Sequence, residues 1–390
     1  MPRHDDWPRS FGFLSSEAEE AHRLKGQFPL IAAMFYPNAT GDELDLEVDQ
    51  QSWYFLFDDA LDEQCGRTPE RVRHLVGLVK EGTAGEASPL PLAAAFADMR
   101  RRGCRDMPED WVQRSAAHWA SSLDHHVHEA RSRQSGTPMS LGTYLRVRRH
   151  TIGVAPVIHL AERLSSCVLP DHLYALPHLS VMREMTKTFI ICDNDIVSLD
   201  KDEALGERNN LVLCLEREHG LSRQEAVDLA LRRRAEALDL FTGAHRALLG
   251  SATAGRLDPA ERDLLQRYCT EALQTTVRGA HDWHHVSTRY RGQRPAPPFH
   301  DRARSPFQDR TARTRHSRGA APRPTTARRP SSPPNGTGPA RSTRRRTCAG
   351  CATRTACPGC ASSTRCAARS RPSSSPGTAT SGPPSRTSAW

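Results

Sequence analysis

The last part of the chain lacks every large aliphatic side chain. From Asp301 to Trp390 there is no Leu, Ile, Val or Met, and the segment consists mainly of Arg, Ala, Pro, Ser, Thr and Gly. Such a composition cannot bury enough apolar area to offset the entropy that is lost on ordering. The sequence therefore predicts a folded domain over residues 1–300 and a disordered tail over residues 301–390.

Lysine is also absent from this tail, which carries 18 arginines and two aspartates, a net charge of +16. Because the whole chain sums to +9, residues 1–300 carry −7. The pI of about 9.2 is therefore a property of the tail and not of the folded domain. The arginines are typical either of attachment to nucleic acid or an anionic surface, or of a shifted reading frame in a GC-rich gene. The composition favours the second interpretation, so nucleic acid is an unlikely partner.

Long apolar runs are missing as well. No segment approaches the roughly 18 apolar residues of a membrane helix, and residues 1–16 lack the charged start and apolar core of a signal peptide. Six cysteines are scattered singly through residues 1–300, as expected of reduced thiols in a cytoplasmic protein. The tail pairs Cys348-x-x-Cys351 and Cys357-x-x-Cys360 stand too close together, without hydrophobic residues around them, to predict a zinc site.

Alternating strand patterns and hairpin dipeptides are absent from residues 1–300, which excludes a β-rich fold. Helical periodicity predicts an all-α fold, in which Ser222 with Glu225, and Asp258 with Glu261, start helices. The expected helices span residues 17–35, 42–64, 69–81, 91–102, 108–133, 139–166, 177–203, 222–249 and 258–290.

The first candidate site is an acidic cluster at the end of an apolar segment. Asp58, Asp59 and Asp62 occupy positions i, i+1 and i+4, so a helix places Asp58 and Asp62 on one face, one turn apart. The preceding run, residues 53–57, is too apolar for an exposed acidic helix, and Phe55 lies on the face of the two carboxylates. The pattern predicts carboxylates at the rim of an aromatic-lined wall.

The second candidate site repeats polar side chains at helical spacing. Asn194, Ser198 and Asp202 stand four residues apart, so one helix would carry their oxygens in a single stripe. Oxygen ligands without a convincing Cys or His partner suit a hard cation such as Mg2+, which substrate phosphate oxygens usually complete. Either motif alone is often a solvated helix surface. Together, about 135 residues apart and each after an apolar run, they predict a metal-dependent site for a diphosphate substrate.

In this order and spacing the two motifs resemble the metal-binding walls of bacterial class I terpene synthases of the sesquiterpene synthase kind. The resemblance covers roughly residues 20–295. It implies an α-helical bundle with a central cavity, and a carbon–oxygen lyase that ionises a linear isoprenyl diphosphate and cyclises the carbocation. It also implies three Mg2+ ions, for which Mn2+ can substitute, and it leaves a homodimer open. The implied metal ligands are Asp58, Asp59, Asp62, Asn194, Ser198 and Asp202.

The resemblance also assigns a diphosphate sensor. In the family this is an Arg that stands 46 positions before the Asn of the second motif, and here that position is Arg148. Thr151 and Ile152 then fall at the linker and effector positions, with Gly153 one residue later. Other arginines in the same basic segment are competitors for the role.

A second diphosphate contact is implied near the end of the helical region. Arg289 and Tyr290 match the Arg-Tyr pair that ends the family's last core helix, and Trp283 stands six residues before it as a cavity-lining aromatic, a role also implied for Phe55. The earlier pair Arg267-Tyr268 is a decoy that lacks such an aromatic.

The second motif departs from the family pattern at its third ligand, which is usually Glu. Here Asp202 is one methylene shorter, and Glu203 lies about 100° away around the helix. Asp202 is therefore the better candidate, with an open question about its affinity for the metal. Lys201 matches the basic residue that commonly precedes this ligand and reaches the diphosphate.

Chain length of the substrate is open. Family base rate favours farnesyl diphosphate, with geranyl and geranylgeranyl diphosphate close behind. Alternative functions are an isoprenyl diphosphate synthase, which would need a second Asp-rich motif, and nucleic-acid binding through the tail. The His residues at 281, 284 and 285 suggest a separate metal site only weakly, because no upstream Glu accompanies them.

Overall fold

The computed structural model describes residues 3–14, 26–61, 68–81, 90–251 and 255–290, with isolated positions between 17 and 24. These residues form helices and no β-strand, which confirms the prediction of an all-α fold. Asp62 and the predicted tail lie outside the described residues, so the domain boundary stays a prediction. No helix in the described part of the chain combines the length and the apolar character that a membrane crossing requires.

The described helices follow one another along the chain in this order. They are α1 (Arg3–Ser10), α3 (Phe28–Phe35), α4 (Asp42–Ala60), α5 (Pro69–Glu81), α6 (Pro91–Gly103), α7 (Glu109–Ser135), α8 (Leu141–Thr151), α9 (Val154–Leu164), α10 (Asp171–Tyr174), α11 (Pro177–Val197), α12 (Leu199–Ala204), α13 (Leu211–His219), α14 (Arg223–Leu249), α16 (Pro259–Arg267), the π-helical η3 (Tyr268–Gln274) and α17 (Thr275–Val286).

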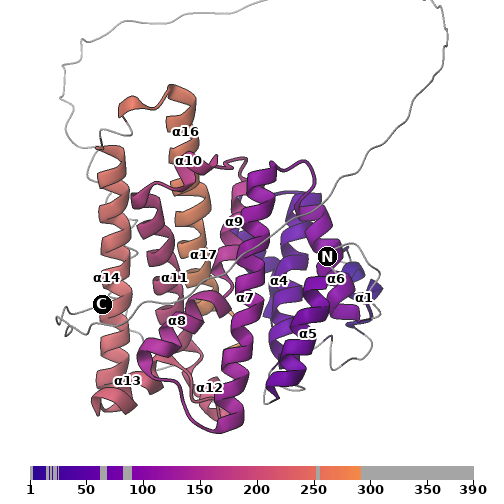
Figure 1. Ribbon diagram of the computed structural model, residues 1–390, viewed down its shortest axis with the longest axis vertical. Helices are drawn as coiled ribbons and strands as arrows, with labels where there is room; N and C mark the ends of the chain where they lie inside the picture. The colour runs from indigo at the N-terminus through magenta and orange to yellow at the C-terminus, as the bar shows by residue number, and fades with distance from the viewer. Residues whose placement is uncertain are drawn as a thin grey trace, which may run out of the picture. The chain divides into compact units, whose positions relative to one another are not determined.

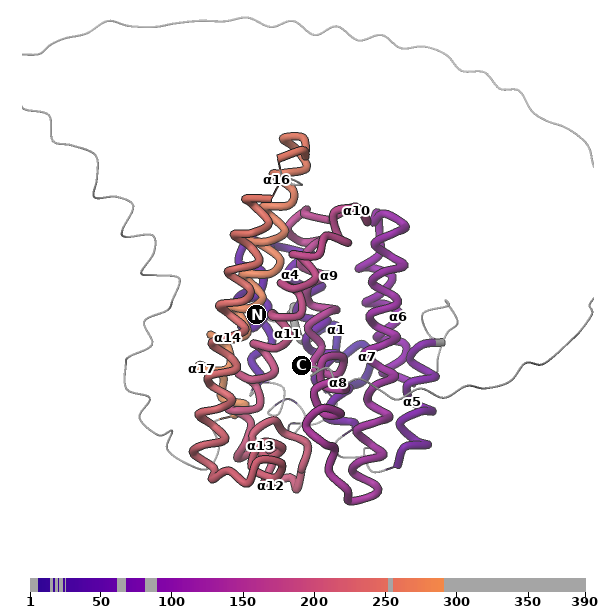
Figure 2. Tube along the Cα trace, turned by 60° about the vertical axis from the view of Figure 1, so that its left-hand side comes forward, coloured from indigo at the N-terminus to yellow at the C-terminus, as the bar shows by residue number. Residues whose placement is uncertain are grey.

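Two groups of long helices flank the centre of the bundle. α4, α5, α6 and α7 lie on one side, and α11, α14 and α17 lie on the other, with α8 and α9 between them (Figure 1). α11 packs along α14, α17 packs against α3 and α11, and α7 packs against α5, α8 and α9 (Figure 2). The two candidate motifs, at the ends of α4 and α11, therefore belong to opposite sides of the bundle.

Aromatic packing on one face of α4 explains why an acidic motif can follow an apolar run. Trp53 and Phe57 are fully buried, with ring centroids 5.0 Å apart, and Trp53 also contacts Phe96 at 4.6 Å. The Trp53 indole donates a hydrogen bond to the Leu92 carbonyl at 2.8 Å. Each buried ring removes a large apolar area from water, so this face anchors α4 to α6 and leaves its other face for the centre of the bundle.

Two predicted helices are interrupted, and both breaks lie in the candidate site. The predicted helix over residues 139–166 is divided into α8 and α9 at Gly153, whose φ of +77° is a left-handed conformation. The predicted stripe over residues 177–203 is divided at Ser198, which ends α11 and precedes α12. The backbone N–H groups of Ser198 and Asp202 still bond to the carbonyls four residues earlier, at 2.8 and 2.9 Å. The one-helix prediction was therefore wrong, although the ligand spacing survives.

The predicted helix starts are confirmed. Ser222 with Glu225, and Asp258 with Glu261, each form a reciprocal capping box. The prediction over residues 258–290 ran too far, because α17 ends at Val286. The sequence analysis also missed α1, α10 and α13, because such short helices leave little room for a periodic pattern.

Gly153 is required by its surroundings as well as by its backbone. A Cβ atom at this position would lie 2.6 Å from the Tyr54 ring, whose hydroxyl donates to the Thr151 carbonyl at 2.6 Å. We expect Gly153→Ala to lower the free energy of unfolding by about 1–3 kcal/mol, measured by urea denaturation. Gly142→Ala in α8, where a Cβ meets nothing within 4 Å, is the matched control and should be neutral or stabilising. Equal effects of the two changes would contradict this role for the break.

Candidate active site

A cavity of about 560 Å³ opens between the two groups of helices. One part of its wall is apolar, with Ile31, Phe35, Phe55, Ile190 and Trp283, and the other part is polar and charged. Residues from α3, α4, α7, α8, α9, α11, α12 and α17 contribute to it. The residues that the sequence analysis assigned to the diphosphate and metal site, and that the structure describes, all line this cavity. Besides Phe55 and Trp283 they are Asp58, Asp59, Arg148, Ile152, Asn194, Ser198, Lys201, Asp202, Arg289 and Tyr290.

A guanidinium contacts both carboxylates of the first acidic wall. Arg289 Nη2 lies 3.1 Å from Asp59 Oδ1 and 4.0 Å from Asp58 Oδ2. The same guanidinium lies over the Phe55 ring, 4.5 Å from its centroid, and its side chain is 7% exposed. The Asp58 side chain is 37% exposed and faces open space in the cavity. The wall thus presents one carboxylate to the cavity and uses the other to hold the cation.

The second acidic wall is a chain of polar contacts. Ser198 Oγ donates to Asp202 Oδ2 at 2.7 Å, and Asn210 Nδ2 donates to the same oxygen at 2.9 Å. Burial raises the pKa of the Asp202 carboxyl above its ordinary value, although these hydrogen bonds act in the opposite direction. Glu203 instead pairs with Arg223 at 2.7 Å on the exposed surface. The geometry therefore points Asp202, and not Glu203, at the cavity.

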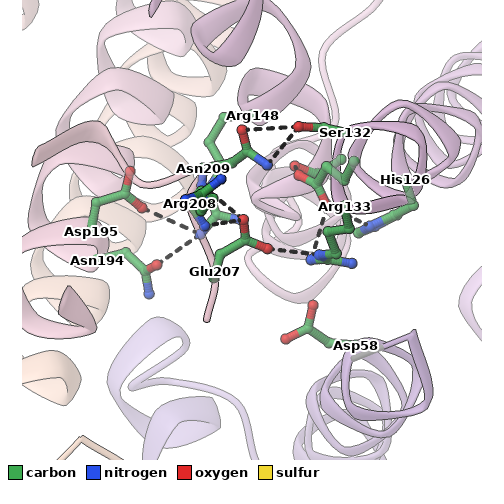
Figure 3. Close-up of polar contacts among 12 residues, drawn as sticks. Asp58, His126, Ser132, Arg133, Arg148, Asn194, Asp195, Glu207, Arg208 and Asn209 are labelled. Atoms are coloured by element: carbon green, nitrogen blue, oxygen red, sulfur yellow. Dashed lines mark hydrogen bonds and ion pairs between the residues drawn. The ribbon is translucent and has the colours of Figure 1, made fainter. Parts of the chain in front are cut away.

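Arg148 of α8 is the cation of the second wall. Its Nη2 donates to Asn194 Oδ1 at 2.8 Å and lies 3.5 Å from Asp195 Oδ1 (Figure 3). Burial disfavours the charge, but Tyr144 and Asp195 nearby raise the pKa of Arg148 well above its ordinary value, so it stays protonated. Its Nε is buried and has no hydrogen-bond partner among the described residues. A donor of this kind is suited to an anionic ligand in the cavity.

Asp195 is a central residue that the sequence analysis missed. Its carboxylate accepts hydrogen bonds from the Tyr144 hydroxyl and from the Leu211 backbone N–H, the latter at 2.9 Å, while also facing Arg148. Burial raises the pKa of Asp195 above its ordinary value, and the contact with Arg148 opposes that shift. The sequence signal was an acid shortly after the apolar run at residues 189–192, one residue off the expected ligand stripe.

The orientation of the Asn194 amide is fixed from both sides. Its Oδ1 accepts from Arg148, while its Nδ2 donates to Tyr290 Oη at 3.1 Å and lies 3.4 Å from His284 Nε2. His284 Nδ1 is 2.8 Å from Asp193 Oδ2. Since the carboxylate only accepts, the His284 proton lies on Nδ1, which leaves Nε2 as an acceptor for the amide. This arrangement directs the amide oxygen toward Arg148.

The α8–α9 break joins the cavity to α7. The Thr151 hydroxyl donates to Glu129 Oε1 at 2.6 Å. Burial acts to raise the pKa of Glu129. The hydrogen bond from His126 and the positive charge of nearby arginines outweigh this effect and lower the pKa to about 2, so the carboxylate is ionised. Ile152 and Gly153 follow directly and line the cavity. The effector position of the sequence analysis therefore lies at the cavity wall.

Polar residues that the sequence analysis did not single out also line the cavity. Arg133 Nε on α7 is 2.7 Å from Glu207 Oε2 in the segment between α12 and α13, and Asn209 Nδ2 donates to Ser132 Oγ at 3.0 Å. In Figure 3 these groups lie beside Arg148, with Asp58 facing them from a separate helix. They tie the second acidic wall to α7.

The decoy pair Arg267-Tyr268 lies elsewhere. Arg267 Nη1 donates to the Ser166 carbonyl at 2.8 Å, and Tyr268 is fully buried outside the set of cavity-lining residues. Only the pair Arg289-Tyr290 reaches the cavity.

The donor set fits a hard divalent cation together with an anion. Carboxylate, amide and hydroxyl oxygens approach the cavity from two walls, as oxygen-preferring cations require. The guanidinium groups of Arg289 and of the partly buried Arg148, whose Nε has no partner among the described residues, provide donors for phosphate-type oxygens.

Comparison with known proteins agrees with this geometry. Residues 50–239 match the model of "Terpene synthase family 2, C-terminal metal binding". The chain is 41% identical over 288 residues to pentalenene synthase of Streptomyces exfoliatus, which covers 73% of this chain and 85% of that protein. It is 34% identical over 291 residues to a (−)-β-caryophyllene synthase of Saccharothrix espanaensis, covering 73% of this chain and 82% of that protein.

The fold is likewise similar to solved terpene synthases. Linalool/nerolidol synthase from Streptomyces clavuligerus in complex with 2-fluorogeranyl diphosphate superposes with a TM-score of 0.66 and 31% identity, covering 73% of this chain and 96% of that one. The bundle therefore has the fold of class I terpene synthases. The chain belongs to the terpene synthase family, whose members are carbon–oxygen lyases that act on diphosphates.

Truncation of Asp195 should cost much more stability than truncation of Asp58. Asp195→Ala leaves the Tyr144 hydroxyl, the Leu211 N–H and Arg148 without their buried acceptor, so we expect a loss of about 3–5 kcal/mol in the free energy of unfolding. Asp58→Ala removes a carboxylate that faces the cavity and should cost less than about 1 kcal/mol. Chemical denaturation of both variants measures this, and similar losses would show that Asp195 is not the structural centre of the second wall.

Proposed function

We propose that this protein is a Mg2+-dependent terpene synthase that ionises a linear isoprenyl diphosphate, farnesyl diphosphate above all, and cyclises the resulting carbocation to a terpene hydrocarbon or alcohol. The observation that carries the proposal is the pair of oxygen-rich walls on α4 and α11–α12, each with one guanidinium, above an aromatic part of the same cavity. Family membership gives the reaction class, and the site supports the finer assignment.

The metal ions would be held by the two walls. Asp58, with Asp59 and Asp62, would hold two Mg2+ ions, and Asn194, Ser198 and Asp202 would hold a third; Mn2+ can substitute. When bound, these ions neutralise charge on the diphosphate oxygens and so make it a better leaving group. The fixed amide of Asn194 supports its role, because its oxygen is already directed away from the Tyr290 and His284 side.

The diphosphate would be gripped by Arg148, Lys201, Arg289 and Tyr290. Arg148 offers the unpartnered Nε, and Arg289 lies next to the carboxylates that would bind metal. Fixed cations around the leaving oxygens stabilise the negative charge that develops as the C–O bond breaks. Movement of Arg289 from Asp59 to the diphosphate would free that carboxylate and close the two walls over the ligand.

The apolar part of the cavity would shelter the carbocation. The Phe55 ring stacks on the Phe28 ring, with centroids 5.0 Å apart, and its centroid lies 5.5 Å from that of Trp283. These contacts hold the Phe55 and Trp283 rings in place. Cation–π contact with such rings stabilises a passing cation by roughly 0.5–2 kcal/mol each. Ile152, beside the break at Gly153, would contact the isoprenyl chain of the substrate near its diphosphate and complete this apolar wall.

Farnesyl diphosphate is the first choice of substrate. The relative from Saccharothrix is named for cyclisation of (2E,6E)-farnesyl diphosphate, while a similar solved structure holds 2-fluorogeranyl diphosphate. An isoprenyl diphosphate synthase is disfavoured, since the second wall is not Asp-rich. Nucleic-acid binding would rest on the tail, which lies outside the described residues. We expect a cytoplasmic enzyme, and a homodimer remains compatible with the site.

A direct test incubates the full-length protein with geranyl, farnesyl and geranylgeranyl diphosphate in the presence of Mg2+. Diphosphate release is followed by a coupled assay, and products are identified by gas chromatography with mass spectrometry. We expect a cyclic C15 product with farnesyl diphosphate and no turnover in the presence of a chelator. Turnover without divalent metal, or coupling of two isoprenoid units to a longer diphosphate, would overturn the proposal.

Replacement of a ligand on either wall should abolish product formation without unfolding the protein. Asp58→Ala and Asn194→Ala each remove one metal contact, and we expect less than about a tenth of wild-type turnover at saturating Mg2+, a barrier increase above about 1.4 kcal/mol. Asp239→Ala on the exposed face of α14 is the matched control and should retain full activity. Higher residual turnover in a folded variant would remove that residue from the ligand set.

Asp202→Glu restores the family's usual third ligand. Because the longer carboxylate reaches further into the cavity, we expect the Mg2+ concentration for half-maximal activity to fall or stay unchanged. Glu203→Gln should leave it unchanged, since Glu203 pairs with Arg223 on the surface. A Mg2+ titration of steady-state rates measures both. A large loss in Asp202→Glu, or a shift in Glu203→Gln, would contradict the assignment of Asp202.

A further inference from the structure

A second group of metal-binding side chains lies outside the cavity walls just described. His281 and His285 are one turn apart on α17, with ring centroids 4.3 Å apart. Their side chains are 34% and 41% exposed, so both are open to solvent ions. Two His residues at i and i+4 on one helical face can share a metal ion, as they do in helical zinc motifs.

A third ligand comes from a different helix. Asp193 of α11 is fully buried, and its Oδ1 lies 3.2 Å from His281 Nδ1 and 4.0 Å from His285 Nε2. One ligand atom from each of these three residues can be chosen so that all lie within 4.8 Å of one another. The sequence did not indicate this acid, because it stands 88 residues before His281 and becomes its neighbour only through the packing of α17 on α11 (Figure 1).

The two separations that involve Asp193 are close to those of a tetrahedral transition-metal site. With metal–ligand bonds near 2.1 Å, neighbouring ligand atoms in a tetrahedral zinc site are about 3.4 Å apart. The Asp193–His281 separation already meets this value. The Asp193–His285 separation is longer by about half an ångström, which a small rotation of an exposed imidazole corrects.

We propose that Asp193, His281 and His285 form a binding site for a divalent transition-metal ion of the zinc class, separate from the Mg2+ walls. Imidazole nitrogens favour Zn2+, Co2+ or Ni2+ over Mg2+, which prefers oxygen and retains its water. The ion would link α17 to α11 beside Asn194 and stabilise that junction. The site does not depend on the proposed function, since none of its three ligands is assigned to the reaction.

The same residues also form hydrogen bonds and ion pairs, which compete with binding of a metal ion. Asp193 Oδ1 contacts Arg234 of α14, and Asp193 Oδ2 accepts from His284 at 2.8 Å. The His284 contact uses the other carboxylate oxygen and is compatible with a bound ion. The Arg234 charge lies beside the metal ligand and weakens binding, so the site should bind zinc less tightly than a structural zinc site does.

The test counts bound ions on the full-length protein. Isothermal titration with Zn2+, at Mg2+ in large excess, compares the wild type with His281→Ala/His285→Ala and with His219→Ala, a matched change at an exposed His of α13. Because any ions held by the tail cysteines are common to all variants, the proposal predicts one fewer bound ion in the double variant alone. Equal stoichiometry in all three proteins would overturn it.

A second measurement on the wild type avoids dependence on the folding of the variants. Modification of histidines by diethyl pyrocarbonate, mapped by mass spectrometry, should be slowed at His281 and His285 by Zn2+ and unchanged at His219. The thermal midpoint of the wild type should also rise with Zn2+ by more than that of the double variant. Equal protection at all three histidines, or none at His281 and His285, would show that Asp193 and its neighbours form only a hydrogen-bond cluster.

Discussion

Each oxygen-rich wall of the cavity contacts a guanidinium that is largely withdrawn from water, and the rest of the site depends on these two contacts. Arg289 holds Asp59 on the first wall, and Arg148 contacts Asn194 and Asp195 on the second. Carboxylates gathered around one cavity repel one another and are costly to bury, so the fold needs cations there even without a ligand. Those same cations suit a diphosphate, which links the stability of the site to the binding of a ligand.

Interruptions of regular helices place these groups. The break at Gly153 follows the end of α8 at Thr151, about one turn after Arg148, and the Tyr54 ring of α4 packs against Gly153. The break at Ser198 turns α12 so that Asp202 meets Asn210 while the four-residue hydrogen bonds persist. A straight helix at either place would not bring backbone and side chains to the cavity in this way. The site is therefore built at helix ends, supported by the aromatic core around Trp53.

The sequence predicted the helical class, and it singled out the two acidic motifs and the Arg-Tyr pair that line the cavity, because the evidence for them is local. Acids at helical spacing after an apolar run locate both walls, and a fixed offset along the chain singles out Arg148 from its basic neighbours. The choice of Arg289-Tyr290 over Arg267-Tyr268 needed only the aromatic at 283. Residues a few turns apart carry the signal for the two walls and for the Arg-Tyr pair, whereas Arg148 was found through the family's offset of 46 positions.

Contacts between distant helices could not be read in the same way. Asp195 lies one residue off the ligand stripe, and its partners Tyr144 and Leu211 are 51 and 16 residues away. The Arg133–Glu207 pair and the Asp193–His281 contact likewise join helices that meet only after the bundle has packed. The breaks at Gly153 and Ser198 were missed because helical periodicity continues across them. Tertiary packing decides all of these features.

The most direct test of the central claim is a crystal structure of the protein with Mn2+ and inorganic diphosphate, with the metals located by anomalous scattering. The account predicts metal peaks at Asp58 on one wall and at Asn194, Ser198 and Asp202 on the other. It also predicts diphosphate in contact with Arg148, Lys201, Arg289 and Tyr290. Diphosphate bound elsewhere, or metal peaks absent from both walls at saturating Mn2+, would contradict it.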